Sequence, residues 1–144
     1  MSTRSSVSCA AVLIALSACT VLDNPKPTEQ TAVIKPGQWG KVYRGGYLEI
    51  VSVSGVEPAW HLRSALAVPA GDRSAVFSVD LCNGGPWDCI PIVETRIAFR
   101  AQAGHAYIPR ARERVNGSNR FWVWVEEEGT GHVVGGTVPD MPES

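Results

Sequence analysis

Arginine occupies alternate positions in one stretch of the sequence, at Arg110, Arg112 and Arg114. In a β-strand this spacing places all three side chains on one face, each about 6.6 Å from the next. Arg96 and Arg100 face outward on the preceding predicted strand, so hairpin pairing would gather five guanidinium groups into one patch. Guanidinium groups bind phosphates and carboxylates through paired hydrogen bonds. The spacing predicts a patch for lipid phosphate, lipopolysaccharide or an acidic partner, and the alternative is a solvated edge balanced by nearby glutamates.

Two cysteines, Cys82 and Cys89, enclose residues 83–88. If Cys9 is removed with an export signal and Cys19 is lipidated, Cys82 and Cys89 are an even pair in an oxidising compartment, where a disulfide is the default. Loop-closure entropy for so short a ring gives a stabilisation of ~2–2.5 kcal/mol. The alternative is a redox or metal pair, but the spacing is neither C-x-x-C nor part of a four-ligand set. The sequence therefore predicts a structural disulfide.

Trp87 lies inside this loop and follows two glycines and a proline. If the indole is exposed, it is a rigid contact residue that loses little conformational entropy when a partner binds. If the indole is tucked onto the domain, it is only a part of the core. The sequence leaves both alternatives open.

No pattern in the sequence indicates a catalytic or metal-binding site. His61, His105 and His132 are not at ligand spacing, and no cysteine or paired carboxylate pattern accompanies them. There is no Gly-x-Ser-x-Gly elbow and no free thiol paired with a histidine. The acidic run 126–128 ends an apolar strand and lacks the alternating oxygen ligands of a calcium loop. We expect a non-enzymatic protein without metal or cofactor.

The beginning of the sequence has the features of an export signal. A polar start with one positive charge, Arg4, precedes an apolar run from Val7 to Leu16, which is too short to span a bilayer. The run ends in Leu16-Ser17-Ala18-Cys19, which resembles the lipobox of bacterial lipoproteins. The resemblance implies cleavage before Cys19, diacylglycerol on its thiol and an acylated amine. The alternatives are an uncleaved hydrophobic helix or an ordinary signal peptide cut near Ala18.

Length and charge limit the possible partners. Without residues 1–18 the chain has 126 residues, enough for one domain with a real core. The 13 basic and 14 acidic side chains nearly cancel, which argues against nucleic acid as a partner, because nucleic-acid-binding domains carry a basic excess.

Acyl chains on Cys19 would hold the domain at a membrane, since two acyl chains anchor a protein firmly and one binds marginally. Thr20 replaces the aspartate that, by resemblance, favours inner-membrane retention, so the periplasmic face of the outer membrane is expected.

The rest of the chain predicts a tethered β-domain. Residues 19–30 indicate a lipidated cysteine and a flexible tether, residues 31–138 a β-sandwich domain, and residues 139–144 a frayed tail. Apolar residues in the domain recur with a period of two, and turn signals come roughly every 8–12 residues. An all-β fold follows, a single antiparallel sandwich of about seven to eight strands. The predicted strands are 32–34, 47–53, 60–68, 74–82, 93–102, 105–113, 121–125 and 133–134.

Three segments carry a resemblance to known domains: the turn 68–71 entering the strand 74–82, the run 97–107, and the strand 122–126 with the following 129–136. Their pattern is similar to small bacterial envelope lipoproteins with a PEGA-like or transthyretin-like β-sandwich, whose functions are mostly unknown. The resemblance covers about residues 68–136, implies the fold and brings no catalytic residues. A type VI secretion adaptor lipoprotein would share the anchor and the sandwich, which makes it an analogy.

The leading prediction is a lipid-anchored, non-enzymatic envelope protein that docks a protein or glycan at the membrane surface. The anchor would raise its effective concentration for neighbouring molecules. The second hypothesis is a cell-wall hydrolase, which would need a pocket with convergent titratable groups, such as two histidines and a carboxylate. The third is a small-ligand carrier with an apolar cavity inside the sandwich.

Overall fold

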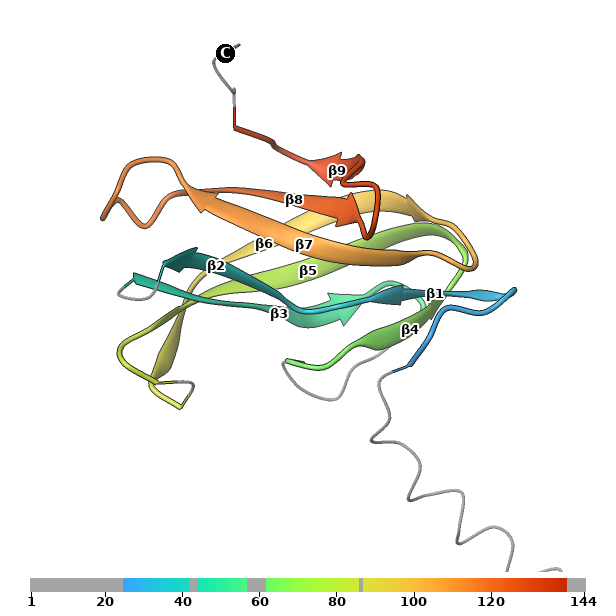
Figure 1. The fold of residues 1–144 in the computed structure, drawn as a ribbon, viewed down its shortest axis with the longest axis horizontal. Helices are drawn as coiled ribbons and strands as arrows, with labels where there is room; N and C mark the ends of the chain where they lie inside the picture. The colour runs from blue at the N-terminus through green and yellow to red at the C-terminus, as the bar shows by residue number, and fades with distance from the viewer. Residues whose placement is uncertain (1–24, 42–43, 57–61, 86, 140–144) are drawn as a thin grey trace, which may run out of the picture.

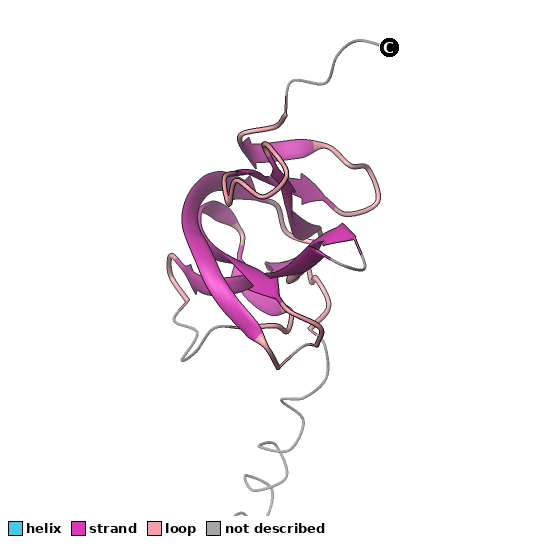
Figure 2. Ribbon diagram, turned by 90° about the vertical axis from the view of Figure 1, so that its left-hand side faces the viewer, coloured by secondary structure: helices cyan, strands magenta, loops and turns pink. Residues whose placement is uncertain are grey.

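The computed structural model describes residues 25–41, 44–56, 62–85 and 87–139, and this part of the chain consists of strands and loops (Figure 2). Several predicted features lie outside the described residues. These are the signal peptide 1–18, the lipidation site Cys19, His61 and the tail residues 140–144. The described residues form nine strands: β1 (Thr31–Ile34), β2 (Gly37–Lys41), β3 (Arg44–Val53), β4 (Leu66–Pro69), β5 (Gly71–Cys82), β6 (Cys89–Ala101), β7 (Ala106–Glu113), β8 (Phe121–Glu127) and β9 (Val133–Gly136). The all-β prediction is confirmed.

The strands form two sheets that pack against each other (Figure 1). One sheet has five strands in the order β4-β1-β7-β8-β9, and the other has four in the order β2-β3-β5-β6. Neighbouring strands run antiparallel except β1 and β7, which pair in parallel at Val33–Ala106 and Ile34–Tyr107. The predicted sandwich is confirmed, with nine strands and one short parallel ladder.

The core lies between the sheets and follows the alternation seen in the sequence. Phe77 of β5 and Ile97 and Phe99 of β6 face inward and are buried. Tyr107 of β7 packs beside Phe99 with ring centroids 5.3 Å apart, and its hydroxyl accepts the backbone N–H of Gln102 at 2.9 Å. That hydrogen bond satisfies a phenol oxygen whose burial would otherwise be costly.

The hairpin predicted between residues 93–102 and 105–113 is wrong. Strand β6 pairs with β5, and β7 pairs with β8 in the other sheet. The turn 102–105 carries the chain from one sheet to the other, with Gly104 at a φ of 81°. A glycine turn can serve a hairpin or a change of sheet, so turn residues alone do not decide between them.

The sequence does not predict β2, because two of its five residues are glycine, which is depleted from strands. Its Trp39 is nevertheless buried, edge-on to Phe121 across the sandwich with ring centroids 4.6 Å apart. The indole Nε1–H donates to the backbone carbonyl of Asp80 at 2.9 Å. A Cβ at Gly46, the β3 partner of Trp39, would lie 1.8 Å from that carbonyl oxygen. The missing side chain leaves room for the carbonyl and for the indole that binds it.

The predicted strand 60–68 is only partly observed: among the described residues, the strand β4 begins at Leu66. Leu62 forms an isolated bridge with Ile50 of β3, with backbone hydrogen bonds of 2.9 Å in both directions. Leu62 therefore lies alongside β3 before the chain enters β4 in the other sheet.

Candidate functional site

The five arginines do not form one patch. Arg96 and Arg100 are exposed on β6 and hydrogen-bond to side chains of β5, on the outer face of the four-stranded sheet. Arg110 and Arg112 are exposed on β7, on the outer face of the five-stranded sheet. The predicted cluster is wrong because β6 and β7 belong to different sheets. The shared face of Arg110 and Arg112 is confirmed, and Arg114 follows the last residue of β7.

Arginine and tryptophan side chains instead meet on the outer face of β7 and β8. The register places Arg110 opposite Trp124 and Arg112 opposite Trp122, with both indoles half-buried. The Arg114 guanidinium lies over the Trp122 ring, 5.5 Å from its centroid, which is a cation–π contact. We call these five residues the Arg–Trp ladder.

One glutamate orders the Arg–Trp ladder. The Glu126 carboxylate accepts Arg110 Nε–H at 3.0 Å and Trp124 Nε1–H at 2.7 Å. An exposed ion pair of this kind adds little to stability, but the two hydrogen bonds fix where the guanidinium and the indole lie. The sequence reveals Trp122 and Trp124 only as strand residues, because a run that is apolar on both faces does not indicate which face stays open.

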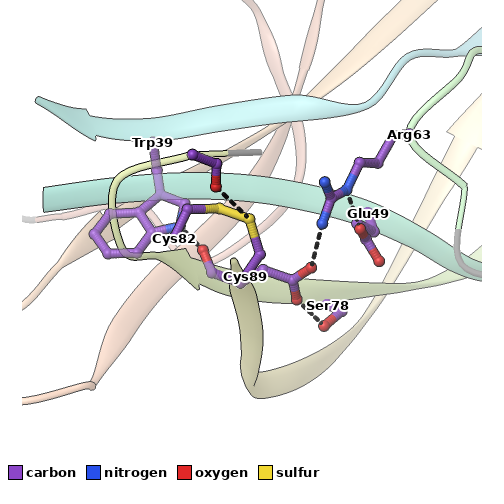
Figure 3. Close-up of a disulfide and its surroundings, with 8 residues drawn as sticks. Trp39, Glu49, Arg63, Ser78, Cys82 and Cys89 are labelled. Carbon is purple, nitrogen blue, oxygen red and sulfur yellow. Dashed lines mark hydrogen bonds and ion pairs between the residues drawn. A yellow bond between two sulfur atoms is a disulfide. The ribbon is translucent and has the colours of Figure 1, made fainter. Parts of the chain in front are cut away.

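The predicted disulfide joins Cys82 at the end of β5 to Cys89 at the start of β6 (Figure 3). Two backbone hydrogen bonds, of 2.9 and 3.2 Å, brace the loop 83–88 that it closes. Trp87 in this loop is 96% exposed, so the surface alternative holds and the core alternative is wrong. Ile90, just after the loop, is 54% exposed.

Replacing Cys82 and Cys89 by serine is expected to lower the free energy of unfolding by about 2 kcal/mol, because the closed loop restricts the unfolded chain. Urea denaturation monitored by tryptophan fluorescence measures the loss. The wild type in reductant serves as the matched control and should unfold at the same urea concentration as the double variant. A double variant as stable as the oxidised wild type would contradict the expected role of the bond.

The disulfide loop lies at the end of the sandwich opposite to residues 25–30, where the chain enters the domain (Figure 1). The loop between β7 and β8 lies at the same end as the disulfide loop, and its Val115 is 68% exposed. Three exposed apolar side chains therefore lie at the end far from the chain entry, on the disulfide loop, at the start of β6 and on the β7–β8 loop. We call Trp87, Ile90 and Val115 the distal tip.

The base of the β7–β8 loop is fixed by Glu113. Its carboxylate accepts two hydrogen bonds from the Arg44 guanidinium at 3.2 Å and one from the Asn119 N–H at 3.0 Å. Burial by itself would raise the pKa of the Glu113 carboxyl, but the backbone amides of Asn119 and Gly117 and the Arg44 guanidinium lower that pKa by more. The loop therefore presents Val115 from a braced base.

Two acidic side chains, Glu49 of β3 and Asp80 of β5, are buried on the outer face of the four-stranded sheet. Arg63 contacts the Glu49 carboxylate and lies 3.8 Å from Asp80 Oδ2 (Figure 3). Its guanidinium also covers the Tyr47 ring, 4.4 Å from the centroid. The Ser78 hydroxyl donates to Asp80 Oδ1 at 2.6 Å. Alternation assigns Ser78 and Asp80 to a polar face, and their burial could not be predicted because Arg63 comes from a distant segment.

Burial raises the pKa of the Asp80 carboxyl, and the Glu49 charge adds to this, while the Ser78 hydrogen bond and Arg63 oppose it. A raised pKa means that the folded chain holds the proton more tightly than the unfolded chain does. The resulting stability is complete below the unfolded pKa of about 3.9 and is lost as the pH rises through the folded pKa.

Asp80→Asn is therefore expected to raise the free energy of unfolding at pH 7 by about 1 kcal/mol, a typical single-substitution effect. Asparagine keeps the acceptor for Ser78 and removes the repulsion with Glu49. Thermal melts between pH 4 and pH 7 should show a flatter profile than the wild type, whereas the exposed Asp72→Asn should leave the profile unchanged. A destabilised Asp80→Asn protein at pH 7 would contradict this reasoning.

A cleft of about 880 Å³ opens beside the chain entry and is lined in part by Pro25, Pro27, Lys35, His105 and Glu127. His105 Nδ1 contacts the Glu127 carboxylate and lowers the pKa of that carboxyl. Lys35 Nζ is 2.7 Å from a carboxylate oxygen of the neighbouring glutamate, Glu128. The charged side chains that line the cleft are thus largely paired with one another.

This cleft differs from the pocket expected of a hydrolase. The His105 imidazole and the Glu127 carboxylate line it, and His132 is not among its lining residues. In the described ranges, no group of three or more histidine, cysteine, aspartate or glutamate side chains is placed to hold a metal ion.

Comparisons with the models of known protein families, with curated proteins and with solved structures find no match. Among the residues with a described position, no helix is long and apolar enough to cross a membrane. The resemblance to PEGA-like or transthyretin-like lipoproteins remains a prediction from the sequence segments that carry it. Three features of the described residues are candidates for a functional site: the distal tip, the Arg–Trp ladder and the cleft.

Proposed function

We propose that this chain is a lipid-anchored, non-enzymatic adaptor of the bacterial outer membrane that docks a protein partner through the distal tip. The anchor would be Cys19 in the lipobox-like run, with a sandwich of the PEGA-like or transthyretin-like kind held beyond it. The observation that carries the docking role is the 96% exposure of Trp87 on a disulfide-closed loop.

The direction of the chain supports this arrangement. An anchor on Cys19 would hold the end of the sandwich at which residues 25–30 enter closest to the bilayer. The distal tip lies at the other end of the long axis (Figure 1). Residues 20–30 can extend at most ~35–40 Å, so the domain would stay within a thin layer above the headgroups. A partner in that layer would meet the exposed indole first.

Trp87 has the properties of a binding hot spot. Tryptophan is enriched among residues that dominate interface energies, because a large ring is buried with few rotatable bonds. The disulfide and the two backbone hydrogen bonds already restrict its loop, so little further ordering is needed on binding. The exposed side chain of Ile90, which follows the loop at the start of β6, extends the surface that a partner could cover, and Val115 is a further exposed apolar side chain at the same end of the sandwich.

Trp87→Ser is expected to lower recovery of the partner at least about tenfold, the loss typical of removing one hot-spot side chain. The lipidated protein is crosslinked in intact cells, extracted in detergent, and its adducts are quantified by mass spectrometry. The fold should keep its stability, since the indole makes no core contact.

Val138→Ser is the matched control, because Val138 is an exposed apolar residue (41%) outside the distal tip. It should recover the partner at the wild-type level. Equal recovery by wild type, Trp87→Ser and Val138→Ser would refute docking through the distal tip. A stoichiometric complex of secretion-machine subunits would narrow the adaptor to the type VI-like role.

A cell-wall hydrolase is the second candidate, and the His105–Glu127 contact in the cleft is the observation that favours it. A carboxylate that holds Nδ1 fixes the imidazole so that Nε2 can act as a base. Turnover of purified peptidoglycan by the wild type, and its loss in His105→Gln, would favour this function over the adaptor.

A further inference from the structure

The Arg–Trp ladder forms a second surface, on the side of the sandwich. Its side chains alternate along two paired strands, so two indoles lie among three guanidinium groups on one sheet face. The surface is distinct from the distal tip, which is carried by loops at one end.

The charges of this surface leave it cationic. Arg110 is neutralised by Glu126 at 3.0 Å. The Arg112 side chain makes no hydrogen bond or ion pair within the described part of the chain, and the Arg114 guanidinium contacts only the Trp122 ring and the Phe121 carbonyl there. Two arginines thus face solvent without an acidic partner among the described residues, although the whole chain carries a net charge of −1. A complementary ligand carries negative charge.

We propose that the Arg–Trp ladder binds an acidic glycan, a chain of pyranose sugars that carry carboxylate groups. The C–H faces of a pyranose pack against the half-buried indoles of Trp122 and Trp124, because an aromatic face attracts polarised C–H groups. The sugar carboxylate takes a paired hydrogen bond from Arg112, whose guanidinium is otherwise uncommitted. The inference goes beyond the docking of a protein at the distal tip and does not depend on it.

The composition of the face favours a glycan over a membrane surface. Both indoles are half-buried in the sheet, whereas insertion into a bilayer needs protruding apolar side chains. Sugar rings need no insertion and can lie along a flat strand pair.

The test titrates the lipidated full chain, in nonionic detergent micelles, with oligogalacturonate, and with a maltooligosaccharide of equal length as the neutral probe. We expect oligogalacturonate to bind at least about tenfold more tightly than the neutral sugar. Arg112→Gln and Trp124→Leu should each weaken binding about tenfold. Arg96→Gln on the opposite face and Trp87→Ser at the distal tip are matched controls that should bind like the wild type.

The contrary outcomes are distinct. No binding of oligogalacturonate, or an equal loss in Arg96→Gln and Arg112→Gln, would overturn the proposal. Phosphatidylglycerol added to the micelles could displace oligogalacturonate from the wild type but not bind the Arg112→Gln variant. That result would also overturn the proposal and make this face a membrane contact. Thermal melts check that each variant is folded, and Arg112→Lys gives a second reading, since it keeps the charge and loses the paired geometry. Its binding should fall between the wild type and Arg112→Gln.

Discussion

Replacing Trp39 by alanine is expected to lower the free energy of unfolding by about 3–5 kcal/mol, the usual cost of truncating a buried tryptophan. The indole is 7% exposed and packs edge-on against Phe121 of the opposite sheet at 4.6 Å. Its loss would leave a cavity between the sheets and remove the donor to the Asp80 carbonyl. A domain of this size has only about 5–15 kcal/mol of stability, so the variant should be marginally folded.

Trp39→Phe is the milder test at the same position. Phenylalanine keeps an aromatic ring against Phe121 but loses the second ring of the indole and its Nε1 donor, so we expect a smaller cost of about 2 kcal/mol. Urea denaturation followed by circular dichroism measures both variants against the wild type. A loss below about 1.5 kcal/mol for Trp39→Ala would mean that β2 contributes little to the core.

Exchanging residues 1–19 for an ordinary cleavable secretory signal is expected to move the protein almost entirely from the membrane fraction to the soluble fraction. Each buried CH₂ of an acyl chain contributes ~0.8 kcal/mol, so chains on Cys19 would hold the protein firmly. Fractionation of cells followed by immunoblotting measures the change.

Intact mass spectrometry of the membrane-bound protein is the companion measurement. A chain that begins at Cys19 and carries the added mass of acyl groups agrees with the lipobox reading. A membrane-bound chain that starts at Met1, or a soluble chain cut near Ala18, would point to the alternatives and remove the anchor from the account.

The sequence predicts individual strands better than their partners. In β5 and β6 the alternation of apolar and polar residues is clear apart from Val76 and Ala98, so Phe77 and Ile97 are correctly assigned to the core. Partner choice depends on contacts between distant segments, which is why the turn at Gly104 appears to be a hairpin and proves to be a change of sheet. Strand β2 is not predicted because its two glycines disfavour a strand, although its Trp39 is buried in the core.

For the candidate sites too, the sequence predicts local features but not the contacts between distant segments. The disulfide could be predicted because an even pair of cysteines in an exported chain forms a disulfide by default, and the structure joins Cys82 to Cys89. Burial of Asp80 depends on Arg63, which comes from the segment before β4 and leaves no local signal at position 80. The Arg–Trp ladder combines a visible arginine spacing with tryptophans from the next strand, so only the register of β7 and β8 brings it together.

The adaptor account joins an anchor at one end of the chain to a docking surface at the other. Photocrosslinking from position 87 of the lipidated protein in living cells tests this most directly, with the crosslinker at the exposed Glu94 on the side of β6 as the control. The account predicts one dominant protein adduct from position 87, absent from position 94 and greatly reduced when the anchor is removed by the signal exchange. The same adducts from both positions, or no protein adduct from position 87, would contradict the account.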